Sequence, residues 1–155
     1  MDWSDTADEA AFRGRVRELI ETKLPKRYHD LAEQDHRETY YPWAMDRASG
    51  DPDRERASRE WLEAGAAERW VAPHWPAEYG GGGLSWMEQF LLNAEFARAN
   101  VAAPASNVGL NMLGPTLIVH GTDDQKRRFL PPILTGETVW AQGFSEPGAG
   151  SDLAS

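Results

Sequence analysis

The chain has 155 residues, enough for one domain with a modest core. Its formal net charge of −9 argues against nucleic acid or an anionic membrane surface as the main partner, because both are negatively charged. The absence of cysteine excludes disulfides and thiolate metal sites. With an acidic N-terminus that does not resemble a signal peptide and no apolar run long enough to span a bilayer, we expect a cytoplasmic protein.

The first stretch with a regular pattern is residues 5–24. Its apolar residues follow the spacing of one helical face, and Pro25 ends the pattern, which predicts an amphipathic helix. Residues 26–54 are less regular, and we expect part helix and part loop. His29 and His36 lie in this region, but the region offers no third ligand, so we interpret them as surface histidines rather than a metal site.

A second helix is predicted from Arg54 to about Arg69, where charged residues and alanine dominate. Residues 70–83 then hold two prolines, four glycines and three large aromatic side chains, a composition typical of an ordered loop. The glycines are not followed by the Lys-Ser/Thr pair that a phosphate-binding loop needs. We therefore interpret the loop as structural, with its aromatic side chains as anchors.

Ser85 with Glu88 forms a capping box, which predicts a helix that continues to Val101. Within it, Glu95 and Arg98 are three residues apart and can pair on the helix surface. We interpret this pair as support for the helix, not as part of a chemical site.

Residues 107–120 predict another helix, in which Pro115 forms a kink or lies in the first turn. Thr122 with Gln125 forms a second capping box, and the helix that it opens is expected to run to about Leu134. The first 134 residues are thus dominated by helical patterns.

The end of the chain differs. Residues 137–144 lack a helical period and predict a strand, and a loop rich in Pro, Gly and Ser follows. The predicted fold class is therefore mainly α, with an N-terminal helical domain at 1–136 and the beginning of a β-domain at 137–155. Because no second strand is predicted, we expect 137–155 to be poorly ordered or extended away from the helices.

The loop after the predicted strand has the features of a ligand-binding turn. Gly148 and Gly150 let the backbone approach a ligand closely, and successive N–H groups can hold an anion. The run Gln142–Leu153 closely resembles the flavin-binding signature of the acyl-CoA dehydrogenases. Three upstream runs resemble the same family in the same order: Pro76–Leu84, Asn111–Thr116 and Gly121–Pro131.

The resemblance implies the family's fold, which has an N-terminal helical domain, a middle β-domain and a C-terminal helix bundle. We expect the chain to contain the first domain and the start of the second, as an N-terminal portion of the enzyme. The implied protein is an oxidoreductase and FAD flavoprotein of lipid and fatty acid metabolism. It desaturates an acyl-CoA substrate, passes electrons to an electron-transfer flavoprotein, and forms homo- or hetero-oligomers.

The resemblance also assigns residues. Gln142, Gly143 and Phe144 match the positions along the flavin ring, and the Ser145 hydroxyl and backbone match a flavin contact. Ser151 matches the serine that reaches the flavin phosphates and borders the CoA substrate. Many relatives have Tyr at Gln142 and a smaller aliphatic residue at Phe144, so the acyl class stays open, and core packing is the alternative role for Phe144.

The catalytic base of the family comes from the C-terminal bundle, so no carboxylate of this chain is assigned to it. Glu146 stands inside the signature, but we interpret it as an acceptor of loop N–H groups. Because the rest of the flavin site is missing, we expect the 155-residue chain alone to bind FAD weakly or not at all.

Two alternatives stay open. One is a flavin-dependent oxidase or monooxygenase on the same fold, although the run 145–152 favours the dehydrogenases. The other is a non-catalytic helical module that pairs with a complementary flavoprotein subunit.

Overall fold

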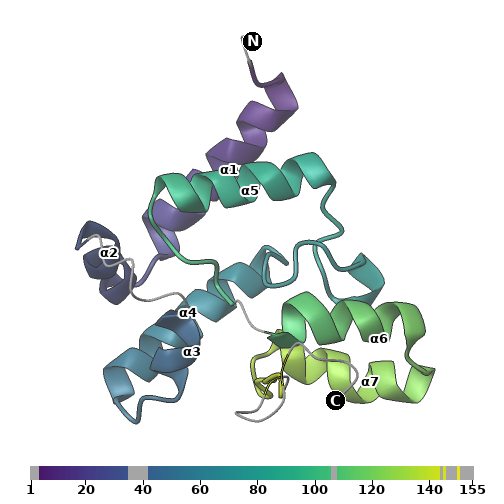
Figure 1. Cartoon of the computed structure of the whole chain (residues 1–155). Helices are drawn as coiled ribbons and strands as arrows, with labels where there is room; N and C mark the ends of the chain where they lie inside the picture. Colours follow the sequence, from purple (N-terminus) through teal and green to yellow (C-terminus); the bar gives the residue numbers. More distant parts are fainter. Residues whose placement is uncertain (1–3, 35–41, 106–107, 144, 146–149, 151–155) are drawn as a thin grey trace.

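The computed structural model describes residues 4–34, 42–105, 108–143, 145 and 150. The described part is built of helices and loops, which confirms the mainly α prediction (Figure 1). Its elements are α1 (Ala7–Lys23), α2 (Lys26–Glu33), α3 (Pro42–Arg47), α4 (Pro52–Ala67), η1 (Ala77–Tyr79), α5 (Trp86–Arg98), η2 (Gly109–Leu113), α6 (Gly114–His120) and α7 (Asp123–Leu134).

The helices pack in three groups. Helix α5 lies against α1, α3 lies against α4, and α6 runs beside α7 (Figure 1). Helix α4 also contacts α1 and α2, so it connects the first group to the second.

Capping residues set the helix starts. Both predicted capping boxes are present, Ser85 with Glu88 at α5 and Thr122 with Gln125 at α7. Helix α1 begins with a third box, in which the Thr6 hydroxyl accepts from the Glu9 N–H and the Glu9 carboxylate accepts from the Thr6 N–H. Each box satisfies helix N–H groups that would otherwise lack a partner.

Two clusters of buried side chains form the core. The first joins the inner faces of α1, α4 and α5, and it contains Trp61 and Trp70. The second lies between the C-terminal part of α4, the loop at 71–75, η2 and α7, and it contains Leu62 and Trp75. The predicted loop anchors are thus confirmed for Trp70 and Trp75, which are buried one in each cluster.

Pro115 lies in the first turn of α6, as predicted, but the preceding turn is wider than an α-helix. Residues Gly109–Leu113 form a π-helical turn, and the Gly114 N–H bonds to the Gly109 carbonyl five residues back. A proline ring clashes with the carbonyl four residues before it, so a wider turn there removes the conflict. The π turn also leaves the Leu110 carbonyl as acceptor for the Trp75 indole N–H, 3.0 Å away.

The predicted strand at 137–144 is wrong for the residues that the structure describes. Residues 137–143 form a bend followed by coil. A strand needs a neighbour for its backbone N–H and C=O groups, and the described part of the chain offers none. The expectation that this segment leaves the helices is also wrong at its start, because Trp140 packs against Phe129 of α7. Most of the rest of the segment lies outside the described residues.

Candidate functional site

The predicted strand that leads to the flavin contacts starts at residue 137, shortly after α7 ends at Leu134. Gly136 takes a left-handed conformation at φ +66° and turns the chain back onto the helix. The Thr138 N–H then bonds to the Pro132 carbonyl at 3.0 Å. The path of the chain into the predicted flavin segment is therefore set by α7.

Three of the predicted flavin residues are described. Gln142, Gly143 and Ser145 are all exposed, and residues 141–143 form coil. A Cβ atom added at Gly150 would lie 3.0 Å from both Cβ and Oγ of Ser145, so the two residues are held close together. The other predicted site residues, Phe144 and Ser151, and the discounted base Glu146 lie outside the described residues.

These features fit a flavin. Residues 141–143 are exposed and belong to no helix, so their N–H and C=O groups suit a planar ring with a hydrogen-bonding edge. The close approach of Gly150 to Ser145 tolerates no larger residue at 150 without displacement, as expected for a turn that folds tightly around a ligand. The Trp140 indole N–H is buried without a hydrogen-bond partner among the described residues, so it is a donor with no acceptor yet.

Two of the cavities on the described part of the helical domain are considered for ligand binding. The larger, about 610 Å³, is lined by charged residues of both signs from α2 and α4, which does not suit an acyl chain. The smaller, about 160 Å³, lies between α5 and the loops around residues 70–74 and 103–105, and its lining mixes apolar side chains with His74, Gln89 and two asparagines. Pockets for drug-sized ligands start at about 300 Å³, so the smaller cavity holds only a few carbon atoms.

His74 lines the smaller cavity and is its titratable group. Burial lowers the pKa of His74, and the hydrogen bond to the Leu110 backbone only partly opposes this effect. The imidazole is therefore neutral at pH 7, and the cavity presents no charge from its histidine.

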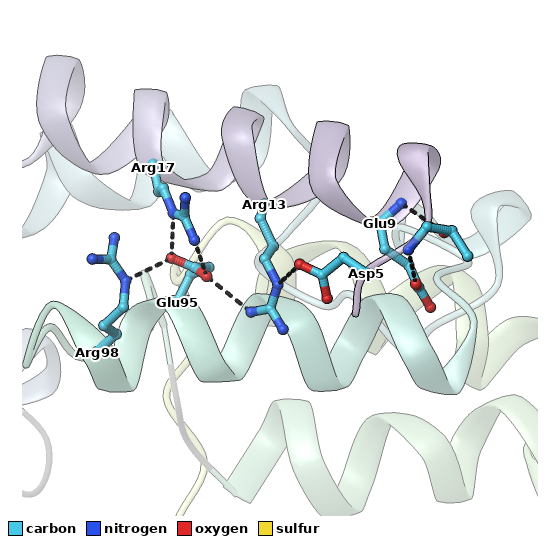
Figure 2. Close-up of polar contacts among 7 residues, drawn as sticks. Asp5, Glu9, Arg13, Arg17, Glu95 and Arg98 are labelled. Carbon is cyan, nitrogen blue, oxygen red and sulfur yellow. Dashed lines mark hydrogen bonds and ion pairs between the residues drawn. The ribbon is translucent and has the colours of Figure 1, made fainter. Parts of the chain in front are cut away.

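A second feature is an ion cluster between α1 and α5 (Figure 2). The Glu95 side chain is 2% exposed. Arg17 donates to both of its oxygens at 2.8 and 2.9 Å, and Arg13 and Arg98 each donate at 2.9 Å. Arg13 also donates to Asp5 at 2.8 Å, which extends the cluster to the start of α1.

The cluster keeps Glu95 ionised. The hydrogen bond from Arg17 contributes most to lowering the pKa of Glu95 to about 2; burial opposes it, and Arg98 and Arg13 add to it. A carboxylate with this pKa is a poor proton acceptor at neutral pH, so Glu95 holds helices together and is unsuited to act as a general base.

A similar arrangement surrounds Asp46 of α3, which is fully buried. Arg27 of α2 donates to it at 2.8 Å and Arg54 of α4 at 2.9 Å. Burial alone would raise the pKa of Asp46, but the hydrogen bonds from the two arginines outweigh burial and lower it. Asp46 therefore ties three helices together as a permanent anion.

Sequence reasoning found the Glu95–Arg98 pair and missed Arg13 and Arg17. A signal was present: Glu95 falls between Leu91 and Phe96 in the apolar stripe of α5, where a charge needs partners. The four-residue spacing of Arg13 and Arg17 places both on one face of α1. The contact between the two helices is a tertiary feature that spacing alone does not give.

Comparison with known proteins decides the family. Residues 6–137 match the family model described as "Acyl-CoA dehydrogenase, N-terminal domain". The chain belongs to the acyl-CoA dehydrogenase family. This confirms the family suggested by the signature motifs, and members of the family bind FAD.

Individual acyl-CoA dehydrogenases support the assignment. The chain is 40% identical over 134 residues to acyl-CoA dehydrogenase IpdE1 of Mycolicibacterium smegmatis, a match that covers 78% of this chain and 34% of that protein. It is 46% identical over 110 residues to IpdE1 of Mycobacterium tuberculosis, which covers 68% of this chain and 29% of that protein. The chain thus spans about a third of the length of these relatives.

Solved structures of the family match the whole chain. The structure titled "Tcur3481-Tcur3483 steroid ACAD" superposes with a TM-score of 0.66 at 35% identity and covers 100% of this chain and 36% of its own. The ChsE4-ChsE5 complex from Mycobacterium tuberculosis superposes with a TM-score of 0.66 at 32% identity. That match covers 99% of this chain and 34% of the chain in the complex. Among the described residues, no helix has the length and apolar character to cross a membrane.

Proposed function

We propose that this chain provides the helical domain and the first flavin-contacting segment of an FAD-dependent acyl-CoA dehydrogenase, which forms the α,β double bond of an acyl-CoA thioester. The structural match to a steroid acyl-CoA dehydrogenase over the whole chain carries this proposal. We place the boundary between the helical domain and the β-domain at residues 136 and 137. The end of the matched family model at residue 137 supports that position.

The flavin-facing residues have separate tasks. When FAD is bound, the exposed residues Gln142 and Gly143 would hydrogen-bond along the ring edge, and Phe144 is assigned to the same edge by the resemblance of its motif. Ser145 would add a hydroxyl, and the resemblance of its motif assigns Ser151 to the phosphate side of the flavin and the border of the CoA. FAD, when bound, supplies the acceptor for the hydride from the substrate Cβ.

The proton at Cα needs a base, and the two fully buried carboxylates of the described residues do not fit that role. Glu95 and Asp46 both have lowered pKa values, and each is surrounded by arginine donors inside the helix packing. A base must reach the substrate and carry a pKa suited to proton removal. We infer that the base comes from elsewhere in the assembled enzyme.

We propose a steroid-derived acyl-CoA as the substrate class, because a steroid acyl-CoA dehydrogenase matches the whole chain. We also propose that the protein works in a complex with a second acyl-CoA dehydrogenase subunit, since the ChsE4-ChsE5 structure is a complex. An electron-transfer flavoprotein is the proposed acceptor, and the cytoplasm is the proposed location.

Visible absorption spectroscopy tests the proposal. The protein, purified as expressed from its natural gene together with its neighbouring subunit, is incubated with FAD, desalted and titrated without oxygen with steroid, branched and straight-chain acyl-CoAs. We expect retained flavin absorption that bleaches with the steroid acyl-CoA. Flavin that stays oxidised with every thioester would contradict the dehydrogenase function. Rapid hydrogen peroxide formation in air would indicate an oxidase instead.

A second arm uses the 155-residue chain alone. Because the described residues contain only part of a flavin site, we expect it to lose FAD on desalting. Stoichiometric flavin on the short chain would show that the site assembles without further protein.

A further inference from the structure

Trp140 lies two residues before Gln142, the first residue of the proposed flavin contacts. Its indole packs edge-to-face against Phe129 of α7, with ring centroids 5.8 Å apart and ring planes at 83°. The half-buried indole also packs against the second core cluster of the helical domain. The chain is exposed at 141–143, so Trp140 is the last anchored side chain before those residues.

The backbone before Trp140 is fixed to α7 as well. The Gly136 N–H bonds to the Ile133 carbonyl at 3.3 Å, and the Thr138 N–H bonds to the Pro132 carbonyl at 3.0 Å. A Cβ atom at Gly136 would lie 2.9 Å from the Trp43 ring, so this turn presses against the core. Backbone and indole together define the point from which the flavin segment starts.

The indole N–H of Trp140 is unusual in this molecule. Three buried tryptophans, Trp43, Trp61 and Trp75, each donate their indole N–H to a backbone carbonyl at 3.0–3.1 Å. The Trp140 N–H is equally shielded from water and has no partner among the described residues. An unsatisfied buried donor is costly, and a phenylalanine would fill the same place without that cost.

We propose that Trp140 is a positioning residue for the flavin segment. Its ring fixes the start of the exposed coil at 141–143 on α7, and its N–H donates to a carbonyl oxygen that comes into place when flavin is bound. The role of Trp140 in flavin binding rests on the proposed function. The anchoring of the segment on α7 stands on the structure of the free chain and is tested separately.

The test compares Trp140→Ala, Trp140→Phe and the control Val139→Ala. Val139 is the adjacent residue and is 50% exposed, so its truncation removes no anchor. The first measurement, on flavin-free protein, is hydrogen exchange of the Thr138 amide, which reports the bond to Pro132. We expect at least tenfold faster exchange in Trp140→Ala and wild-type exchange in the other two variants. Unchanged exchange in Trp140→Ala overturns the anchor.

The second measurement is the FAD dissociation constant of the same variants in the complete, naturally expressed protein. We expect weakening by more than tenfold in Trp140→Ala, about fivefold in Trp140→Phe from the lost hydrogen bond, and no change in Val139→Ala. Wild-type affinity in Trp140→Ala overturns the positioning role. If the wild-type protein binds no FAD, the proposed function and the flavin part fail together, while faster Thr138 exchange in Trp140→Ala still supports the anchor.

Discussion

Glu95 is a charged residue at a position where α5 otherwise buries apolar side chains. Its carboxylate accepts from three arginines, two of which belong to α1. Removing one member of a buried ion pair costs about 3–5 kcal/mol, because the remaining charge loses its partner. Arg17 and Arg98 are 45% and 61% exposed and can turn to water, so the lower end of that range applies.

We therefore expect Glu95→Gln to lower the free energy of unfolding by about 3 kcal/mol at pH 7, measured by urea denaturation. The matched control is Glu60→Gln on α4, where the carboxylate is 55% exposed and pairs with Arg56 at 3.8 Å. The control should change stability by less than about 0.5 kcal/mol. Equal effects from the two substitutions would show that the cluster adds no stability.

The same residue sets a pH dependence. The pKa of Glu95 is about 2 in the folded chain against an ordinary value of 4.5. Because the folded pKa is the lower one, the stabilisation is complete above about pH 4.5 and is lost as the pH falls towards 2. We expect the wild-type stability to fall across this range and Glu95→Gln to fall less. Parallel pH curves for the two proteins would contradict this assignment.

At the scale of the elements, replacing two helical glycines by alanine is expected to change stability in opposite directions. A Cβ at Gly114, in the first turn of α6, would lie 1.9 Å from the buried Trp75 ring. A Cβ at Gly14, on the exposed face of α1, would have nothing within 4 Å. We expect Gly114→Ala to destabilise by about 1–3 kcal/mol and Gly14→Ala to stabilise by about 0.5–1 kcal/mol, measured by thermal unfolding. A stabilising Gly114→Ala would disprove the contact between α6 and Trp75.

The elements also show what a sequence can predict. Ser85, Glu88, Thr122 and Gln125 form capping boxes from residues three apart, so their helix starts could be predicted correctly from local spacing. The strand at 137–144 was predicted from the same kind of local pattern, but a strand depends on partners elsewhere. Local pattern therefore predicted helices well and failed for 137–143.

For the candidate site, the sequence indicates which ligand is bound, whereas the fold determines where the side chains around it lie. The run Gln142–Leu153 indicated a flavin without reference to any structure. The contact of Trp140 with Phe129 could not be predicted, because it depends on how Gly136 turns the chain back onto α7. The same holds for Glu95, whose partners Arg13 and Arg17 lie 82 and 78 residues away in the chain.

At the scale of the whole molecule, one tryptophan lies in the core and another lies on the surface. Trp61 is 1% exposed, whereas Trp86 at the start of α5 is 87% exposed. We expect Trp61→Ala to lower the free energy of unfolding by about 3–5 kcal/mol and Trp86→Ala to change it by less than about 0.5 kcal/mol, measured by urea denaturation. A large loss of stability in Trp86→Ala would mean that α5 packs differently from this structure.

Helix α4 contributes to both core clusters through consecutive residues, Trp61 in the first and Leu62 in the second. Consecutive helix residues point about 100° apart, so the two contacts fix the rotation of α4 about its own axis. If α4 rotated about its axis, Trp61 or Leu62 would leave its cluster. A rearrangement of this domain that keeps both clusters packed must then move α4 without rotating it about its axis, and Gly50 and Arg69, which flank the helix, already adopt left-handed backbone angles.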